Sequence, residues 1–196
     1  MPKHPVTVGS KTYEVTTQHV HKTVWIASGN YEGQIIEKKA RAEKGDAEAQ
    51  FNLAGLYFVG QGVDQDYAQA QKWLTKAAEQ DLAPAEYNLG VMYEEGQVAA
   101  KDYKEAMKWY TKAAEQGDAD AQNNLADMYE EGHGVPQDIV RAHMWYSLAA
   151  ASATGDVKND ATESISRIAA KMTPQQIAQA KEMSQRCQQS KFKNCS

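Results

Sequence analysis

Residues 84–117 read PAEYNLGVMYEEGQVAAKDYKEAMKWYTKAAEQG, and this stretch decides the fold because the chain contains it three times. Residues 48–81 (EAQFNLAGLYFVGQGVDQDYAQAQKWLTKAAEQD) and 120–153 (DAQNNLADMYEEGHGVPQDIVRAHMWYSLAAASA) align with it without a gap, at a spacing of 36 residues. The matching columns are Ala49/Ala85/Ala121, Leu53/Leu89/Leu125, Tyr57/Tyr93/Tyr129, Gly60/Gly96/Gly132, Asp66/Asp102/Asp138, Ala70/Ala106/Ala142, Trp73/Trp109/Trp145 and Ala77/Ala113/Ala149. Agreement of this kind at one spacing indicates a tandem structural repeat.

The first half of each unit predicts one helix. Ala49, Leu53, Leu56 and Tyr57 fall at helical spacing on a single face. Gly60 follows directly, and glycine at that place can adopt the left-handed conformation that ends a helix.

The second half predicts another helix. Asp66 is a suitable N-cap, and Ala70, Trp73, Leu74 and Ala77 form an apolar stripe after it. We interpret the tryptophan at this position of each unit as repeat core and not as an aromatic ligand box. The small alanines allow neighbouring helices to approach closely.

A single two-helix unit cannot bury both of its faces, so the units must stack into a solenoid with a cap at each end. We therefore expect an N-terminal extension (1–31), a solenoid (32–187) and a tail (188–196). Within the solenoid the expected parts are an N-cap helix (32–45), three repeats (46–81, 82–117 and 118–153) and a degenerate C-terminal capping repeat (154–187). Thr173 and Gln176 have the spacing of a capping box before the last helix.

The pattern A-x-x-x-L-[GA]-x-x-Y-x-x-G-x-G-V-x-x-D-x-x-x-A-x-x-W-x-x-x-A-A resembles the Sel-one-like repeat family, a relative of the tetratricopeptide repeat. The resemblance covers roughly residues 34–187. Unit two departs from it, because Val98 and Ala99 replace the Gly-Val of the other units. The resemblance implies an all-α, right-handed α-solenoid that serves as a protein scaffold or adaptor, in many cases bacterial, with no catalytic residue common to the family.

Residues 1–31 have a different character. VTV, TYEV and TVWIA are β-branched and aromatic, which predicts two or three short strands in a small hairpin. We expect Trp25 to pack this hairpin against the end of the solenoid. His19 and His21 fall on one face of a strand, but two ligands without a third do not predict a metal site.

Composition and motifs exclude several classes of function. The net charge of −5 argues against binding to nucleic acid, and no apolar run approaches the roughly 18 residues of a membrane span. The common catalytic and phosphate-binding motifs are absent. Ser190 and Lys193 match S-x-x-K without its companion motifs. We therefore expect neither an enzyme nor a cofactor nor a metal, and keep a cell-envelope enzyme as the weakest alternative.

The cysteines leave two possibilities for the compartment. Cys187 and Cys195 could form a disulfide in an oxidising compartment, whereas in the cytosol they would stay reduced. Residues 1–15 show no secretory signal, which favours a cytoplasmic protein, with a periplasmic or secreted one as the alternative if a signal was removed.

In tetratricopeptide-like solenoids the first helices line the concave groove, so the groove residues of this chain can be predicted. They are Phe51, Phe58 and Val59 in unit one, Tyr87, Val91, Glu94 and Glu95 in unit two, and Asn123, Asp127, Glu130 and Glu131 in unit three. Such a groove would change from aromatic to acidic and would bind a basic or partly apolar protein segment. Alternatively, the acidic residues are only a solvated face and the phenylalanines are covered by the N-terminal hairpin.

The function predicted from these features is a non-enzymatic protein-interaction scaffold or adaptor that binds a partner segment in this groove. An immunity or inhibitor protein that neutralises a toxic effector is the alternative, because small acidic repeat proteins suit that use.

Overall fold

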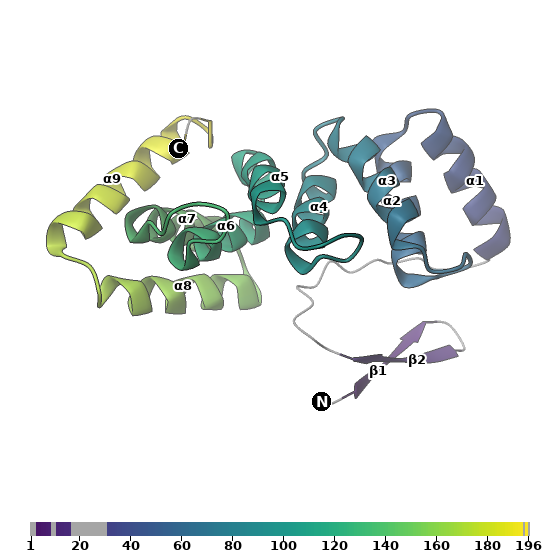
Figure 1. Cartoon of the computed structure of the whole chain (residues 1–196), viewed down its shortest axis with the longest axis horizontal. Coiled ribbons are helices and arrows are strands. Elements are labelled where there is room, and N and C mark those ends of the chain that lie inside the picture. Colours follow the sequence, from purple (N-terminus) through teal and green to yellow (C-terminus); the bar gives the residue numbers. More distant parts are fainter. Residues whose placement is uncertain (1–2, 9–10, 17–30, 194, 196) are drawn as a thin grey trace.

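The computed structural model describes residues 3–8, 11–16, 31–193 and 195, and within them it shows an all-α solenoid preceded by a two-stranded hairpin (Figure 1). The helices are α1 (Tyr31–Glu43), α2 (Ala47–Val59), α3 (Tyr67–Ala78), α4 (Ala83–Glu95), α5 (Tyr103–Glu115), α6 (Ala119–Glu131), α7 (Ile139–Ser152), α8 (Gly155–Ala169) and α9 (Pro174–Gln189). The predicted fold class is thereby confirmed.

Each repeat is a hairpin of two helices, and the hairpins follow one another along the long axis of the molecule (Figure 1). Within the repeats α2 packs on α3, α4 on α5, and α6 on α7. Between them α3 packs on α4 and α5 on α6, while α1 covers the first repeat and α8 and α9 cover α7.

The same local signals shape every repeat. Gly60, Gly96 and Gly132 end α2, α4 and α6 in the left-handed conformation, with φ of 71°, 68° and 76°. Asp66, like its equivalents in the other repeats, caps the following helix with its carboxylate. The backbone N–H of this aspartate also donates to the carbonyl of a tyrosine in the preceding helix. The tyrosines are Tyr57, Tyr93 and Tyr129, and the distances are 2.9, 2.9 and 2.8 Å. Unit two therefore closes its loop in the same way, despite Val98.

The core consists of alanines at the helix interfaces and large side chains between them. Trp73, Trp109 and Trp145 are 6%, 8% and 3% exposed, which confirms their interpretation as repeat core. At the C-terminal end, Thr173 and Gln176 form the expected capping box at the start of α9.

Strands β1 (Lys3–Val8) and β2 (Lys11–Thr16) pair in antiparallel register, with Val6 opposite Tyr13. The third predicted strand, the packing of Trp25, and the pair His19 and His21 lie outside the described residues.

Candidate functional site

The first helices of the three repeats carry the predicted groove residues on one line of equivalent positions. We call this surface the first-helix face. It is defined by Phe51, Phe58 and Val59 on α2, Tyr87, Val91, Glu94 and Glu95 on α4, and Asn123, Asp127, Glu130 and Glu131 on α6. Its members differ in exposure. Val59, Glu95 and Glu131 are exposed, whereas Phe51, Phe58, Val91, Glu94, Asp127 and Glu130 are half-buried.

The prediction that all of these side chains are exposed in the groove is wrong for two of them. Tyr87 and Asn123 are only 4% and 7% exposed. They occupy equivalent positions, and their side chains lie largely beneath the surface. They support the first-helix face from below, and Asn123 reaches it at Asp127, to which its Nδ2 donates.

Unit one of the face is apolar. The ring of Phe58 meets that of Tyr67 edge to face, with centroids 5.2 Å apart. Val59 beside it is 48% exposed. Phe51 packs against the core, so the apolar surface that remains accessible centres on Phe58 and Val59.

Unit two of the face combines a carboxylate with a tyrosine of the second helix. The hydroxyl of Tyr110 donates to Glu94 at 2.6 Å. The ring of Tyr110 passes directly over Gly90, where an added Cβ would lie 2.5 Å from its atoms. The absence of a side chain at Gly90 thus lets the tyrosine of α5 reach the carboxylate on α4.

Unit three repeats this arrangement with one more carboxylate. The hydroxyl of Tyr146 donates to Asp127 and, at 3.0 Å, to Glu130. Arg167 of α8 binds Glu130 through both terminal nitrogens, and the side chain of Glu130 is 13% exposed.

The electrostatic setting of Asp127 differs from that of Glu130. Burial, together with the negative charges of Glu131, Glu130 and Glu94, raises the pKa of Asp127 to about 6, although the hydrogen bond from Tyr146 opposes the rise. Burial also raises the pKa of Glu130, but the hydrogen bonds from Arg167 and Tyr146 have the larger effect, so the pKa is lowered overall. Arg167 therefore lowers the pKa of Glu130, whereas Asp127 has no such cation among the described residues.

Tyr110, Tyr146 and Arg167 are part of this network and were not predicted from the sequence. A signal for the tyrosines was present: the column Leu74/Tyr110/Tyr146 changes from apolar to polar in step with the column Phe58/Glu94/Glu130. No comparable signal identifies Arg167, because α8 does not follow the repeat pattern.

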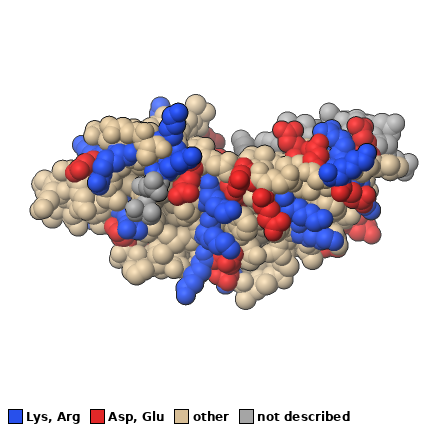
Figure 2. Space-filling view, turned by 90° about the horizontal axis from the view of Figure 1, so that it is seen from above, with Lys and Arg blue, Asp and Glu red and all other residues tan. Residues whose placement is uncertain are grey.

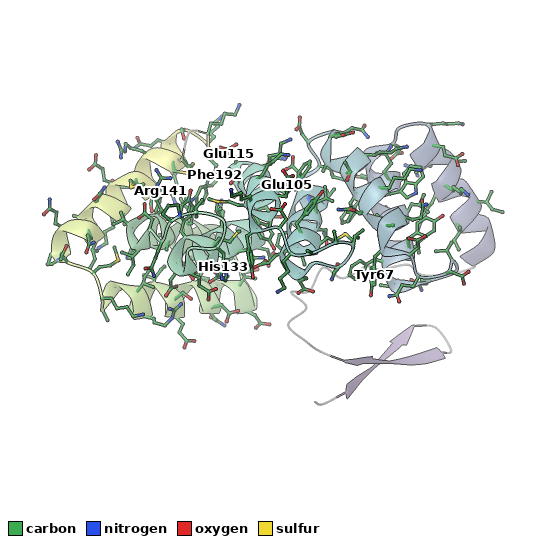
Figure 3. The ribbon with its side chains drawn as sticks, in the orientation of Figure 1. Tyr67, Glu105, Glu115, His133, Arg141 and Phe192 are labelled. Atoms are coloured by element: carbon green, nitrogen blue, oxygen red, sulfur yellow. A yellow bond between two sulfur atoms is a disulfide. The ribbon has the colours of Figure 1, made fainter. Side chains whose placement is uncertain are left out.

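The C-terminal end is held by a disulfide. Cys187 and Cys195 are bonded and are 1% and 6% exposed. Phe192, between them, packs against the turn after α5, where its ring lies 3.3 Å from the place of a Cβ on Gly117 (Figure 3). The bond therefore closes a loop that touches the junction of the second and third repeats.

The charged residues of the described chain form no metal centre, and on one face of the molecule the two signs of charge alternate. On the face seen in Figure 2, groups of Lys and Arg alternate with groups of Asp and Glu along the molecule. No group of three or more His, Cys, Asp or Glu side chains in the described residues is arranged to hold a metal ion. None of the helices described above is both long and apolar enough to cross a membrane.

Comparison with known proteins gives one family. A family model of the Sel1 repeat matches residues 47–82, 83–118 and 119–153. No curated protein matches the chain.

Several solved structures resemble the fold. A Sel1 repeat protein from Oxalobacter formigenes is 38% identical, with a TM-score of 0.60 over 66% of this chain and 98% of that one. Protein c5321 of uropathogenic Escherichia coli, a protective antigen with an SLR fold, is 29% identical with a TM-score of 0.52, over 82% of this chain and 42% of that one. Helicobacter pylori cysteine rich protein B, 21% identical with a TM-score of 0.52 over 67% of this chain and 98% of that one, shares the fold alone.

Proposed function

Because the chain belongs to the Sel1 repeat family, whose members are in general non-enzymatic protein-interaction scaffolds, we propose that it is an adaptor that binds a segment of a partner protein along the first-helix face. The bacterial sources of the similar structures support a bacterial origin.

The observation that carries this proposal is the change of chemistry along equivalent positions of the face. Phe58 and Val59 at the end of α2 correspond to Glu94 and Glu95 at the end of α4. Exposed apolar groups beside carboxylates favour a segment that carries an apolar anchor followed by basic side chains.

We also propose that the protein works in an oxidising compartment, and not in the cytoplasm. The disulfide between Cys187 and Cys195 supports this location, since reducing compartments keep such pairs as thiols. Mass spectrometry of native protein without reductant tests it: a mass lower by two hydrogen atoms is expected, and two free thiols would contradict the proposal.

Site-specific photo-crosslinking in the native cell tests the proposed face. A benzoylphenylalanine at position 58 or 91 on the face should crosslink a partner, because both positions would lie against the bound segment. The same group at position 72 is the control, since Lys72 is exposed on the second helix α3. Equal crosslinking from position 72, or none from positions 58 and 91, would contradict the proposal.

Substitutions then test the two halves of the face separately. The pair Phe58→Ser and Val59→Ser removes the apolar part, and the pair Glu94→Lys and Glu130→Lys reverses the acidic part. Each should weaken retention of the crosslinked partner while the thermal unfolding curve stays cooperative. Unchanged retention by both variants would overturn the proposed groove.

A further inference from the structure

The half-buried carboxylates Glu94 and Asp127 of the first-helix face form no ion pair with any described residue. Each is instead oriented by a tyrosine: Tyr110 donates to Glu94, and Tyr146 donates to Asp127. These two hydroxyls hold the carboxylates in place and leave their negative charge uncompensated.

The amide group of Asn123, next to Asp127 on α6, has a buried oxygen that lacks a donor among the described residues. The Nδ2 of Asn123 lies 3.4 Å from Oδ2 of Asp127, so the end of this side chain is directed at the carboxylate. Its Oδ1 is buried without a hydrogen-bond partner among the described residues, although Asn123 is only 7% exposed. An unsatisfied buried acceptor is costly, and a bound donor would remove the cost.

The protein itself shows what fits such a carboxylate. Glu130 corresponds to Glu94 one repeat earlier, and both accept from the equivalent tyrosines Tyr146 and Tyr110. Both carboxylate oxygens of Glu130 also accept hydrogen bonds from the guanidinium of Arg167. The position 36 residues before Arg167 is Glu131, so the chain has no equivalent arginine for Glu94.

We propose that Glu94, Asp127 and the amide oxygen of Asn123 form a subsite between α4 and α6 for one arginine side chain of the partner segment. The inference rests on the proposed function and specifies one contact of it. The guanidinium would sit on Glu94 as Arg167 sits on Glu130 and would donate to Asp127 and Asn123 as well.

Arginine suits this subsite better than lysine. The guanidinium is planar and carries five N–H donors in a fixed arrangement, which can serve two carboxylates and an amide together. An ammonium group is a compact charge with three donors and is more strongly hydrated, so it loses more on entering a half-buried place. A partner segment with arginine at this register should therefore bind more tightly than one with lysine.

Binding of an octa-arginine peptide and an octa-lysine peptide to the full chain, measured by calorimetry at fixed salt, tests the subsite. Glu94→Gln and Asp127→Asn should each raise the Kd for octa-arginine about tenfold, the loss typical of a charge-assisted hydrogen bond. Asn123→Ala, which leaves the net charge unchanged, should raise it about threefold, the cost of one neutral hydrogen bond. The wild-type protein should bind octa-arginine more tightly than octa-lysine.

Glu79→Gln is the charge-matched control. Glu79 is exposed just after α3, near the start of α4, whereas Glu94 lies at the other end of α4, roughly 18 Å away along that helix. It should change the Kd less than twofold. Equal effects of Glu79→Gln and Glu94→Gln, or no preference for arginine, would overturn the subsite, because the peptide would then sense only net charge.

The outcomes separate this inference from the proposed function. Crosslinking from position 58 together with unchanged octa-arginine binding in Glu94→Gln and Asp127→Asn would retain the groove and refute the subsite. If Asn123→Ala does not fold, the two carboxylate variants still decide the question.

Discussion

Repeat one and repeats two and three have the same backbone and nearly the same core, yet they present different surfaces. In repeat one Phe58 lies above Ala54 and Leu74, and the surface is apolar. In repeat two the equivalent positions hold Glu94, Gly90 and Tyr110, and a hydroxyl reaches the surface from the second helix.

The difference shows that two positions, one on each helix of the repeat, change together: the surface column Phe58/Glu94/Glu130 and the second-helix column Leu74/Tyr110/Tyr146. A carboxylate at the surface is accompanied by a tyrosine that donates to it. The residue between them is small in every repeat (Ala54, Gly90 and Ala126), and only in repeat two is it glycine. The repeat scaffold therefore stays constant while a linked group of side chains determines whether a unit is apolar or acidic.

The largest effect is expected from placing at Gly90 the alanine that repeats one and three have at this position, while Tyr110 is kept. Gly90→Ala places a Cβ against the ring of Tyr110, and the crowding outweighs the better helix propensity of alanine, so the free energy of unfolding should fall by about 2 kcal/mol. Chemical denaturation measures this.

The matched control is the double variant Gly90→Ala with Tyr110→Leu, which reproduces the Ala54 and Leu74 of repeat one. It should regain most of the lost stability. A Gly90→Ala protein that is more stable than wild type would show that Tyr110 moves aside without cost.

Asp127→Asn should raise the free energy of unfolding at pH 7.5 by about 1.5 kcal/mol. This value is smaller than the free energy that corresponds to the whole pKa shift, because the group is partly solvated. The native pKa, about 6, lies above the ordinary value of 3.8, so the ionised carboxylate costs stability above pH 6. The gain should therefore shrink as the pH falls and disappear near pH 4.

The groups that face Asp127 are Tyr146 of α7, Glu94 of α4, and Asn123, Glu130 and Glu131 of α6, with Arg167 of α8 bound to Glu130. Unfolding curves at several pH values provide the measurement, with the exposed Asp64→Asn as control. A gain that does not depend on pH would exclude ionisation as its cause. For the same reason octa-arginine should bind more weakly at pH 5 than at pH 7.5.

Glu86→Gln should make repeat two resemble its neighbours in the core and stabilise the protein by about 1 kcal/mol at pH 7.5, the worth of one hydrogen bond. Gln50 and Gln122, at the equivalent positions, donate to the carbonyls of Ala42 and Ala114 at 3.0 and 3.1 Å. Ionised Glu86 is 1% exposed and cannot donate, and burial raises its pKa.

The thermal midpoints of Glu86→Gln and of the exposed control Glu95→Gln measure this effect. Because the pKa of Glu86 is raised, the gain should decrease as the pH falls and the wild-type carboxyl takes up its proton. A lower midpoint for Glu86→Gln would show that Lys112, 3.9 Å from Glu86, and Gln116 compensate the charge fully.

The smallest effect on stability is expected from Arg167→Gln, about 0.5 kcal/mol, because the arginine side chain is 48% exposed. The change would leave Glu130 without its cation, like Glu94 one repeat earlier. Octa-arginine should then bind more tightly than to the wild type, and an unchanged Kd would weaken the analogy between the two carboxylates.

The helices, their ends and their stacking order follow from the amino-acid sequence alone. Gly60, Asp66 and Trp73 recur at a constant interval, and each acts through local backbone geometry or through burial against the adjacent helix, so their roles follow from position alone. The column that includes Phe58 and Glu94 likewise predicted a face that changes from apolar to acidic.

The packing of the helices determines which of those groups are accessible and which are already paired. Tyr87 and Asn123 are buried, Tyr110 and Tyr146 reach the face from the second helices, and Arg167 binds Glu130 from α8, a helix that does not follow the repeat pattern. These contacts depend on the depth and direction of side chains between stacked helices. A repeat pattern fixes spacing along the chain, but the distance between side chains on different helices is set by how the helices pack.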